Sequence, residues 1–132
     1  MKAVPAPADA VWGVLSDVER WPTWTRSMES VQLDRPFGVG SVADIKQPRL
    51  PRSRMRVTEL DPGRSFTWEG RTPGVRTVAS HLVQPSAAGT SQVILTLEMT
   101  GPLAGAVRLT MGRLIQRYMT IEADGLAEAA SR

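Results

Sequence analysis

The chain has 132 residues, no cysteine and a formal net charge of +3, from 16 Lys and Arg residues against 13 Asp and Glu residues. This length predicts a single domain over residues 1–132 with one core, and the absence of cysteine excludes disulfides and thiolate metal sites and fits a cytoplasmic location. The small charge excess does not indicate nucleic-acid binding, and no apolar run approaches the roughly 18 residues that an integral membrane segment needs.

Two short helices are predicted near the N-terminus. Prolines at positions 5 and 7 stand where the first turn of a helix tolerates them. Val11, Val14 and Leu15 give the helix that follows an apolar side. Because Pro22 disfavours helical backbone at Trp21, we expect a break there and then a second short helix.

A series of strands joined by tight turns is predicted for the middle of the chain. Arg52, Arg54 and Arg56 alternate with smaller or apolar residues, which is the period-two pattern of a half-buried strand with a basic outer face. Residues 92–100 place their apolar side chains on one face in the same way. In residues 75–84 the two faces are nearly equal in apolarity, so either face is a candidate for the inner one. These strands and turns together indicate an antiparallel meander.

The last thirty residues are predicted to form one long helix. Apolar side chains from Leu103 to Leu126 recur at steps of three and four residues, which is the stripe of a helix with one apolar face. About 28 helical residues would span about 42 Å, so this helix needs a broad apolar partner, which the predicted sheet supplies. The order of two short helices, several strands and a long helix argues for an α+β fold with its helices on one face of the sheet.

Several motifs in this order resemble the START-like superfamily, also called the SRPBCC or Bet v 1-like group, which includes the polyketide cyclase/dehydrase family. The motifs are residues 6–12 (APADAVW), 15–17 (LSD), 21–24 (WPTW), 59–64 (ELDPGR), 81–85 (HLVQP) and 89–90 (GT), followed by the long terminal helix. The resemblance covers nearly the whole chain. It implies a helix-grip fold, in which a curved antiparallel sheet wraps the long C-terminal helix and leaves a deep apolar cavity between them.

The chain departs from this family pattern at its beginning. The family has a full first strand before the first helix, whereas only residues 1–4 are available here. We therefore expect a first strand that is very short or missing. An unpaired sheet edge can recruit another chain, so the protein is expected to be a monomer or a homodimer that forms through this exposed edge.

Large apolar side chains are the candidates for the wall of the implied cavity. Aromatic and Met side chains either fill a solid core or line a pocket, where Met adapts to irregular ligands; the resemblance favours the pocket. The predicted ligand-binding residues are Trp12, Trp24, Met28, Met55, Phe66, Trp68, His81, Leu95, Leu97, Met111, Leu114, Ile115, Tyr118 and Met119.

Few side chains are candidates for acid–base chemistry. His81 is the only histidine, and it is either a general acid or base in the cavity or a strand residue that hydrogen-bonds a neighbour. Tyr118 is the other candidate for moving a proton. Glu122 follows Tyr118 by four residues and would border the cavity or lie on the surface, where we expect it. No set of side chains has the spacing of a metal or cofactor site, so we expect neither.

The sequence therefore favours a START-like protein that binds a hydrophobic small molecule (a lipid, a polyketide or an aromatic compound) between the sheet and the last helix. The alternative is an enzyme of the polyketide cyclase or dehydratase type that uses the same cavity, with His81 or Tyr118 moving a proton. A second alternative is a protein-interaction module whose partner docks on the arginine-bearing strand or on the free sheet edge. The fold by itself selects neither the ligand nor an activity.

Overall fold

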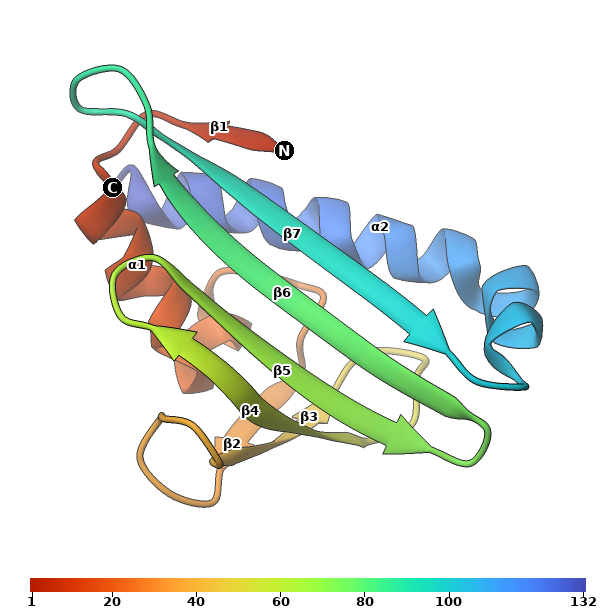
Figure 1. The fold of residues 1–132 in the computed structure, drawn as a ribbon. Coiled ribbons are helices and arrows are strands. Elements are labelled where there is room, and N and C mark those ends of the chain that lie inside the picture. The colour runs from red at the N-terminus through yellow and green to blue at the C-terminus, as the bar shows by residue number, and fades with distance from the viewer.

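Ten elements make up the structure, a computed structural model that describes residues 1–132. In chain order they are β1 (Lys2–Val4), α1 (Ala8–Ser16), the 3-10 helix η1 (Val18–Thr23), β2 (Ser30–Leu33), β3 (Val42–Lys46), β4 (Ser53–Asp61), β5 (Ser65–Thr72), β6 (Val75–Pro85), β7 (Ser91–Thr100) and α2 (Ala104–Ala130). The strands form one sheet in the order β1-β7-β6-β5-β4-β3-β2, and α2 lies across one face of it (Figure 1). The predicted α+β helix-grip fold with two short N-terminal helices is confirmed.

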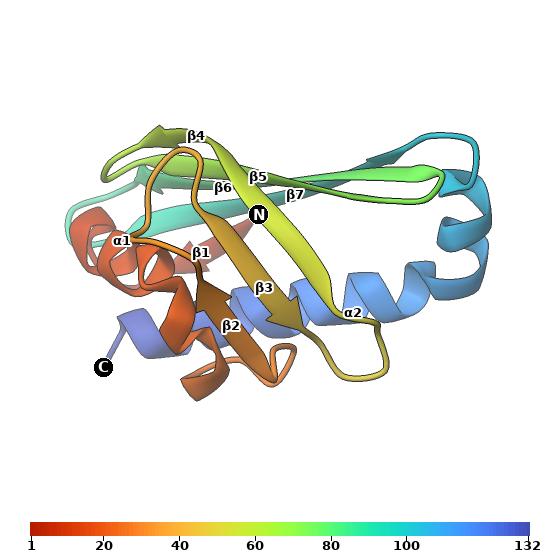
Figure 2. The ribbon, with the colours of Figure 1, turned by 90° about the horizontal axis from the view of Figure 1, so that it is seen from below.

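The sheet curves around α2. Figure 2 shows β4 to β7 as a layer over the helix, with β2 and β3 crossing in front of it. All strand pairs are antiparallel. The register between β4 and β5 shifts between Val57 and Glu59, and such a bulge increases the local twist and bends the strand.

The first strand is present but short. Lys2 pairs with Val93 and Val4 pairs with Ser91, so β1 covers only the first residues of β7. Residues 94–100 of β7 have no strand on that side. An open edge of this kind favours association with another chain, and a homodimer through it stays a prediction.

The hydrophobic core lies where α1, η1 and the end of α2 meet the sheet. Trp21 of η1 is fully buried, and its indole Nε1 donates a hydrogen bond to the carbonyl oxygen of Leu15 at 2.9 Å. Its ring lies 5.3 Å from that of Trp68 and 6.3 Å from that of Phe66, both on the inner face of β5. This cluster of rings packs η1 against the inner face of the sheet.

The helix α2 is buried unevenly along its length. Its buried residues are Ala104, Tyr118, Glu122, Leu126, Ala127 and Ala130, so all but one belong to its second half. Gly125 in that half permits a close approach, because a Cβ there would overlap the backbone carbonyl oxygen of Trp24. The first half has no such packing, and Leu109 is 88% exposed. None of the helices is both long enough and apolar enough to cross a bilayer.

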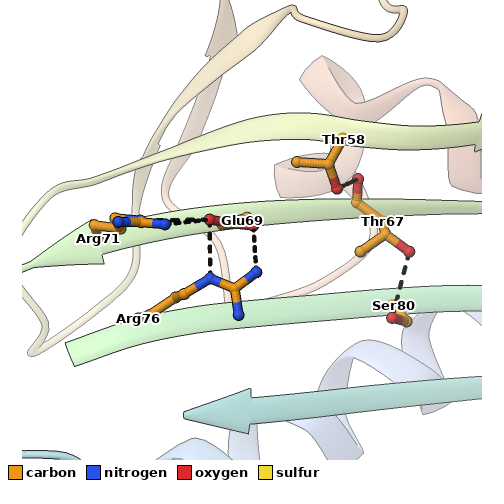
Figure 3. A network of polar contacts seen from close by, with 6 residues as sticks. All are labelled: Thr58, Thr67, Glu69, Arg71, Arg76 and Ser80. Carbon is orange, nitrogen blue, oxygen red and sulfur yellow. Dashed lines mark hydrogen bonds and ion pairs between the residues drawn. The ribbon is translucent and has the colours of Figure 1, made fainter. Parts of the chain in front are cut away.

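The outer face of the sheet is polar and charged. Glu69 accepts hydrogen bonds from Arg76 at 2.8 and 3.0 Å and lies 3.4 Å from Arg71 (Figure 3). The hydrogen bonds from Arg76 lower the pKa of the Glu69 carboxyl. The arginines at positions 52, 54 and 56 are exposed, while Met55 and Val57 between them are buried, as the alternation in this strand predicts.

Candidate functional site

A cavity of about 320 Å³ lies between the inner face of the sheet and α2. Its walls come from η1, from the loop between η1 and β2, from β3 to β7, from the loop between β3 and β4, and from α2. It extends along α2 from Val107 to Glu122, and Met111 and Ile115 line it between these two residues. A space therefore remains between the helix and the curved sheet. The apolar side chains of α2 line this cavity along part of the helix and pack into the hydrophobic core near its C-terminal end.

Most of the residues predicted from the sequence to bind a ligand line this cavity. They are Met28, Met55, Trp68, His81, Leu95, Leu97, Met111, Ile115, Tyr118 and Met119. In β6 the inner face is that of Ala79, His81 and Val83, because His81 and Val83 are buried and Ala79 lines the cavity. Their role in ligand binding stays a prediction.

Four of the predicted residues lie away from the cavity wall. Phe66 is fully buried between other rings, with Phe37 at 5.1 Å and Trp12 at 6.3 Å. Trp24 packs against Trp21, with ring centroids 5.7 Å apart. Leu114 precedes the cavity-lining residue Ile115 on α2, and neighbouring helical residues point about 100° apart. The sequence marked these four as apolar, but apolarity does not distinguish a core position from a pocket position.

The loop between β3 and β4 closes one side of the cavity. Gln47, Leu50 and Pro51 line it, and the hydroxyl of Tyr118 on α2 donates a hydrogen bond to the carbonyl oxygen of Pro48. Sequence reasoning missed these loop residues, because the prolines marked the segment only as irregular. The hydroxyl proton of Tyr118 is engaged by the backbone, so in this structure Tyr118 joins the helix to the loop.

His81 lies in the cavity and also bonds a neighbouring strand, while a role as general acid or base stays a prediction. It lines the cavity, and its ring stacks on that of Phe66 at 4.1 Å. Its Nδ1 lies 3.3 Å from the carbonyl oxygen of Phe66; because a carbonyl only accepts, Nδ1 carries the proton and Nε2 is an acceptor. Burial lowers the pKa of His81 from its ordinary value of 6.5 to about 4, although the bond to Phe66 acts in the opposite direction. The imidazole is therefore neutral at pH 7.

Glu122 corrects the expectation of a surface position. It is only 9% exposed, lines the cavity from α2, and forms no hydrogen bond or ion pair with the protein. Burial raises the pKa of its carboxyl from 4.5 to about 8, so the group is protonated at pH 7. The four-residue spacing from Tyr118 was the signal for this position, since residues four apart share a helix face. A glutamate on a helix is usually exposed, which is why the sequence favoured the surface.

Comparisons with known proteins agree with this architecture. The sequence profile of the family described as "Polyketide cyclase / dehydrase and lipid transport" matches residues 2–131. No curated protein sequence matches the chain.

Solved structures with the same fold include two kinds of enzyme. The Zhui aromatase/cyclase from Streptomyces sp. R1128 is 22% identical with a TM-score of 0.84, over 98% of this chain and 90% of that one. Norcoclaurine synthase from Thalictrum flavum is 16% identical with a TM-score of 0.74, over 96% of this chain and 80% of that one. The di-domain aromatase/cyclase BexL of the BE-7585A biosynthetic pathway is 21% identical with a TM-score of 0.75, over 96% of this chain and 43% of that one. At these identities the likeness establishes the fold.

Proposed function

Because the chain belongs to the polyketide cyclase/dehydrase and lipid-transport family, we propose that it binds a hydrophobic small molecule, such as a lipid, a polyketide or an aromatic compound, in the cavity between the sheet and α2. The observation that carries this proposal is the cavity itself. Its volume of about 320 Å³ is at the lower end of the range of small-molecule sites, and 16 of its 28 lining residues are hydrophobic.

Burial of apolar ligand surface supplies the driving force for such binding. At about 25 cal/mol per Å², a two-ring aromatic molecule that buries about 200 Å² gains about 5 kcal/mol before the costs of immobilisation. Met28, Met55, Met111 and Met119 surround this space. Their unbranched side chains can adapt to a ligand of irregular shape at little cost in rotamer strain.

The test of the pocket is a pair of neighbouring substitutions on α2. Ile115→Trp places an indole in the cavity, and it is expected to weaken binding of the fluorescent probe 1-anilinonaphthalene-8-sulfonate at least about tenfold, because the probe and the indole compete for the same volume. Leu114→Trp adds the same side chain one position away, outside the cavity wall, and is expected to change the affinity less than about twofold. Fluorescence titration measures both.

Equal effects of the two substitutions would contradict the proposed site, since the probe would then respond to the added indole and not to the filled space. Native mass spectrometry of the purified protein provides a second readout. A co-purified hydrophobic molecule that is present in the wild type and in Leu114→Trp, but absent from Ile115→Trp, would support a carrier.

A cyclase-type enzyme is the second candidate, and a specific observation favours it. His81 and Glu122 line the same cavity in opposite roles at pH 7, because the neutral imidazole accepts a proton and the protonated carboxyl donates one. A flexible polyketone folded in this space would meet both groups. Unchanged cyclisation of a linear polyketone by the His81→Ala variant, followed by chromatography of the products, would exclude His81 from catalysis.

A further inference from the structure

The carboxyl of Glu122 is a polar group without a protein partner in a mostly apolar cavity wall. It lies on the cavity side of α2, is more than nine-tenths buried, and receives no hydrogen bond or ion pair from the protein. Two acidic side chains that are more exposed are nevertheless paired: Glu69 with Arg76 on the outer face of the sheet, and Asp124, two residues further along α2, with Lys2 at 2.9 Å. Buried polar groups in folded proteins nearly always have a partner. A partner for Glu122 is therefore expected from the contents of the cavity.

The charged groups around the cavity do not supply that partner. Arg54 and Arg71 belong to its lining but are exposed, and Arg71 interacts with Glu69. His81 is neutral and bonded to Phe66, and the hydroxyl of Tyr118 is bonded to Pro48. No cation therefore balances a carboxylate at position 122.

The elements packed against α2 supply no such cation either. The elements packed most closely against α2 are α1, β1 and β7, and the loop residues Pro48 and Trp24 also touch it. Next to these loop residues, Lys46 bonds to the carbonyl oxygens of Gln47 and Leu50, and Arg26 and Arg49 are exposed. Lys2 of β1 is paired with Asp124, while Asp9 of α1 and Glu98 of β7 are acidic and exposed. The group that faces the cavity is thus a neutral carboxylic acid, which has one O–H donor to offer.

We propose that the Glu122 carboxylic acid is the polar anchor of this cavity, and that the ligand is a hydrophobic molecule whose carbonyl oxygen accepts a hydrogen bond from it. The inference rests on the proposed function, since it requires a ligand in the cavity. A carbonyl ligand suits the site better than an amine, because pairing with an ammonium would bury two charges in an apolar wall. A site built to bond a polar atom also rejects an analogue that lacks it, because its own group is then left unpaired.

Two matched probes test the anchor. 2-Acetylnaphthalene carries a ketone, and 2-isopropylnaphthalene has nearly the same shape without an oxygen. Equilibrium dialysis gives the Kd of each for the wild type, Glu122→Leu and Glu122→Gln at pH 6 and pH 9.5. The measured quantity is the preference, defined as the Kd of the hydrocarbon divided by that of the ketone, which cancels effects common to both probes.

At pH 6 the wild type is expected to show a preference about 2- to 10-fold larger than that of Glu122→Leu, as one hydrogen bond predicts. At pH 9.5 the carboxyl has lost its proton, so the wild-type preference falls to that of Glu122→Leu. Glu122→Gln keeps its preference at both pH values, because its amide donates a hydrogen bond without ionising. This comparison remains informative if Glu122→Leu fails to fold.

The alternative results separate the two proposals. If neither probe binds the wild type, or if Ile115→Trp leaves their binding unchanged, the proposed binding pocket is wrong. The proposed Glu122 anchor is then wrong too, because it depends on that pocket. If both probes bind and Ile115→Trp weakens them, but the preference is the same in all three proteins at both pH values, the pocket stands and the anchor is overturned. If 2-(aminomethyl)naphthalene binds the wild type more tightly than the ketone, and more tightly still as the pH rises from 6 to 8, Glu122 acts as an anion and the carbonyl proposal is overturned.

Discussion

Replacing Glu122 by glutamine is expected to stabilise the folded protein by about 3 kcal/mol at pH 7. The folded-state pKa of this carboxyl is raised from 4.5 to about 8, so the folded protein holds a proton that the unfolded chain releases above pH 4.5. Stability is therefore lost as the pH rises from 4.5 to 8, and each pKa unit corresponds to about 1.4 kcal/mol. Glutamine avoids this cost because its amide stays neutral. Urea unfolding followed by tryptophan fluorescence gives the free energy of unfolding.

The pH dependence distinguishes this effect from a general gain in packing. At pH 4 the advantage of Glu122→Gln is expected to shrink to less than about 1 kcal/mol, because glutamate is then largely protonated in both states. Glu128→Gln is the matched control on the same helix, since Glu128 is exposed and pairs only with Arg132. It is expected to change the free energy by no more than about 1 kcal/mol. An advantage for Glu122→Gln that is the same at pH 4 and pH 7 would contradict the raised pKa.

His81 is expected to make the protein less stable in acid. Its folded-state pKa is lowered from 6.5 to about 4, so its stabilising effect is fully present above pH 6.5 and is lost as the pH falls toward 4. Between pH 7 and pH 5 this loss is about 2 kcal/mol. His81→Gln keeps a donor for the carbonyl oxygen of Phe66 but does not titrate in this range, so the variant is expected not to show this loss of stability.

The two buried groups act in opposite directions over the same pH range. From pH 7 to pH 5 the contribution of Glu122 to stability rises by about 2 to 3 kcal/mol while that of His81 falls by about 2 kcal/mol, so the two contributions are expected to offset each other largely in the wild type. Each single variant shows one contribution by itself: from pH 7 to pH 5 the free energy of unfolding falls in Glu122→Gln and rises in His81→Gln. Unfolding curves at the two pH values test this, and slopes of the same sign in both variants would contradict it.

Local patterns in the sequence determined the elements and their order. The alternation in β4 placed the arginines at positions 52, 54 and 56 outside and Met55 and Val57 inside, because successive side chains of a strand point to opposite faces. The three- and four-residue stripe defined α2, since its period is that of a helix. The order of these elements and their motifs then indicated a sheet gripping a helix with a cavity between them.

The tertiary structure alone decided which apolar residues face that cavity and what chemical state its polar groups have. Phe66 and Trp68 lie on the same face of one strand, yet only Trp68 lines the cavity, because Trp12 and Phe37 cover Phe66. Glu122 belongs to a common helical pattern, but the curvature of the sheet around α2 buries its carboxyl without a partner and raises its pKa. Periodicity fixes the face of an element on which a residue lies. What covers that face depends on residues distant in the chain, whose approach no local pattern encodes.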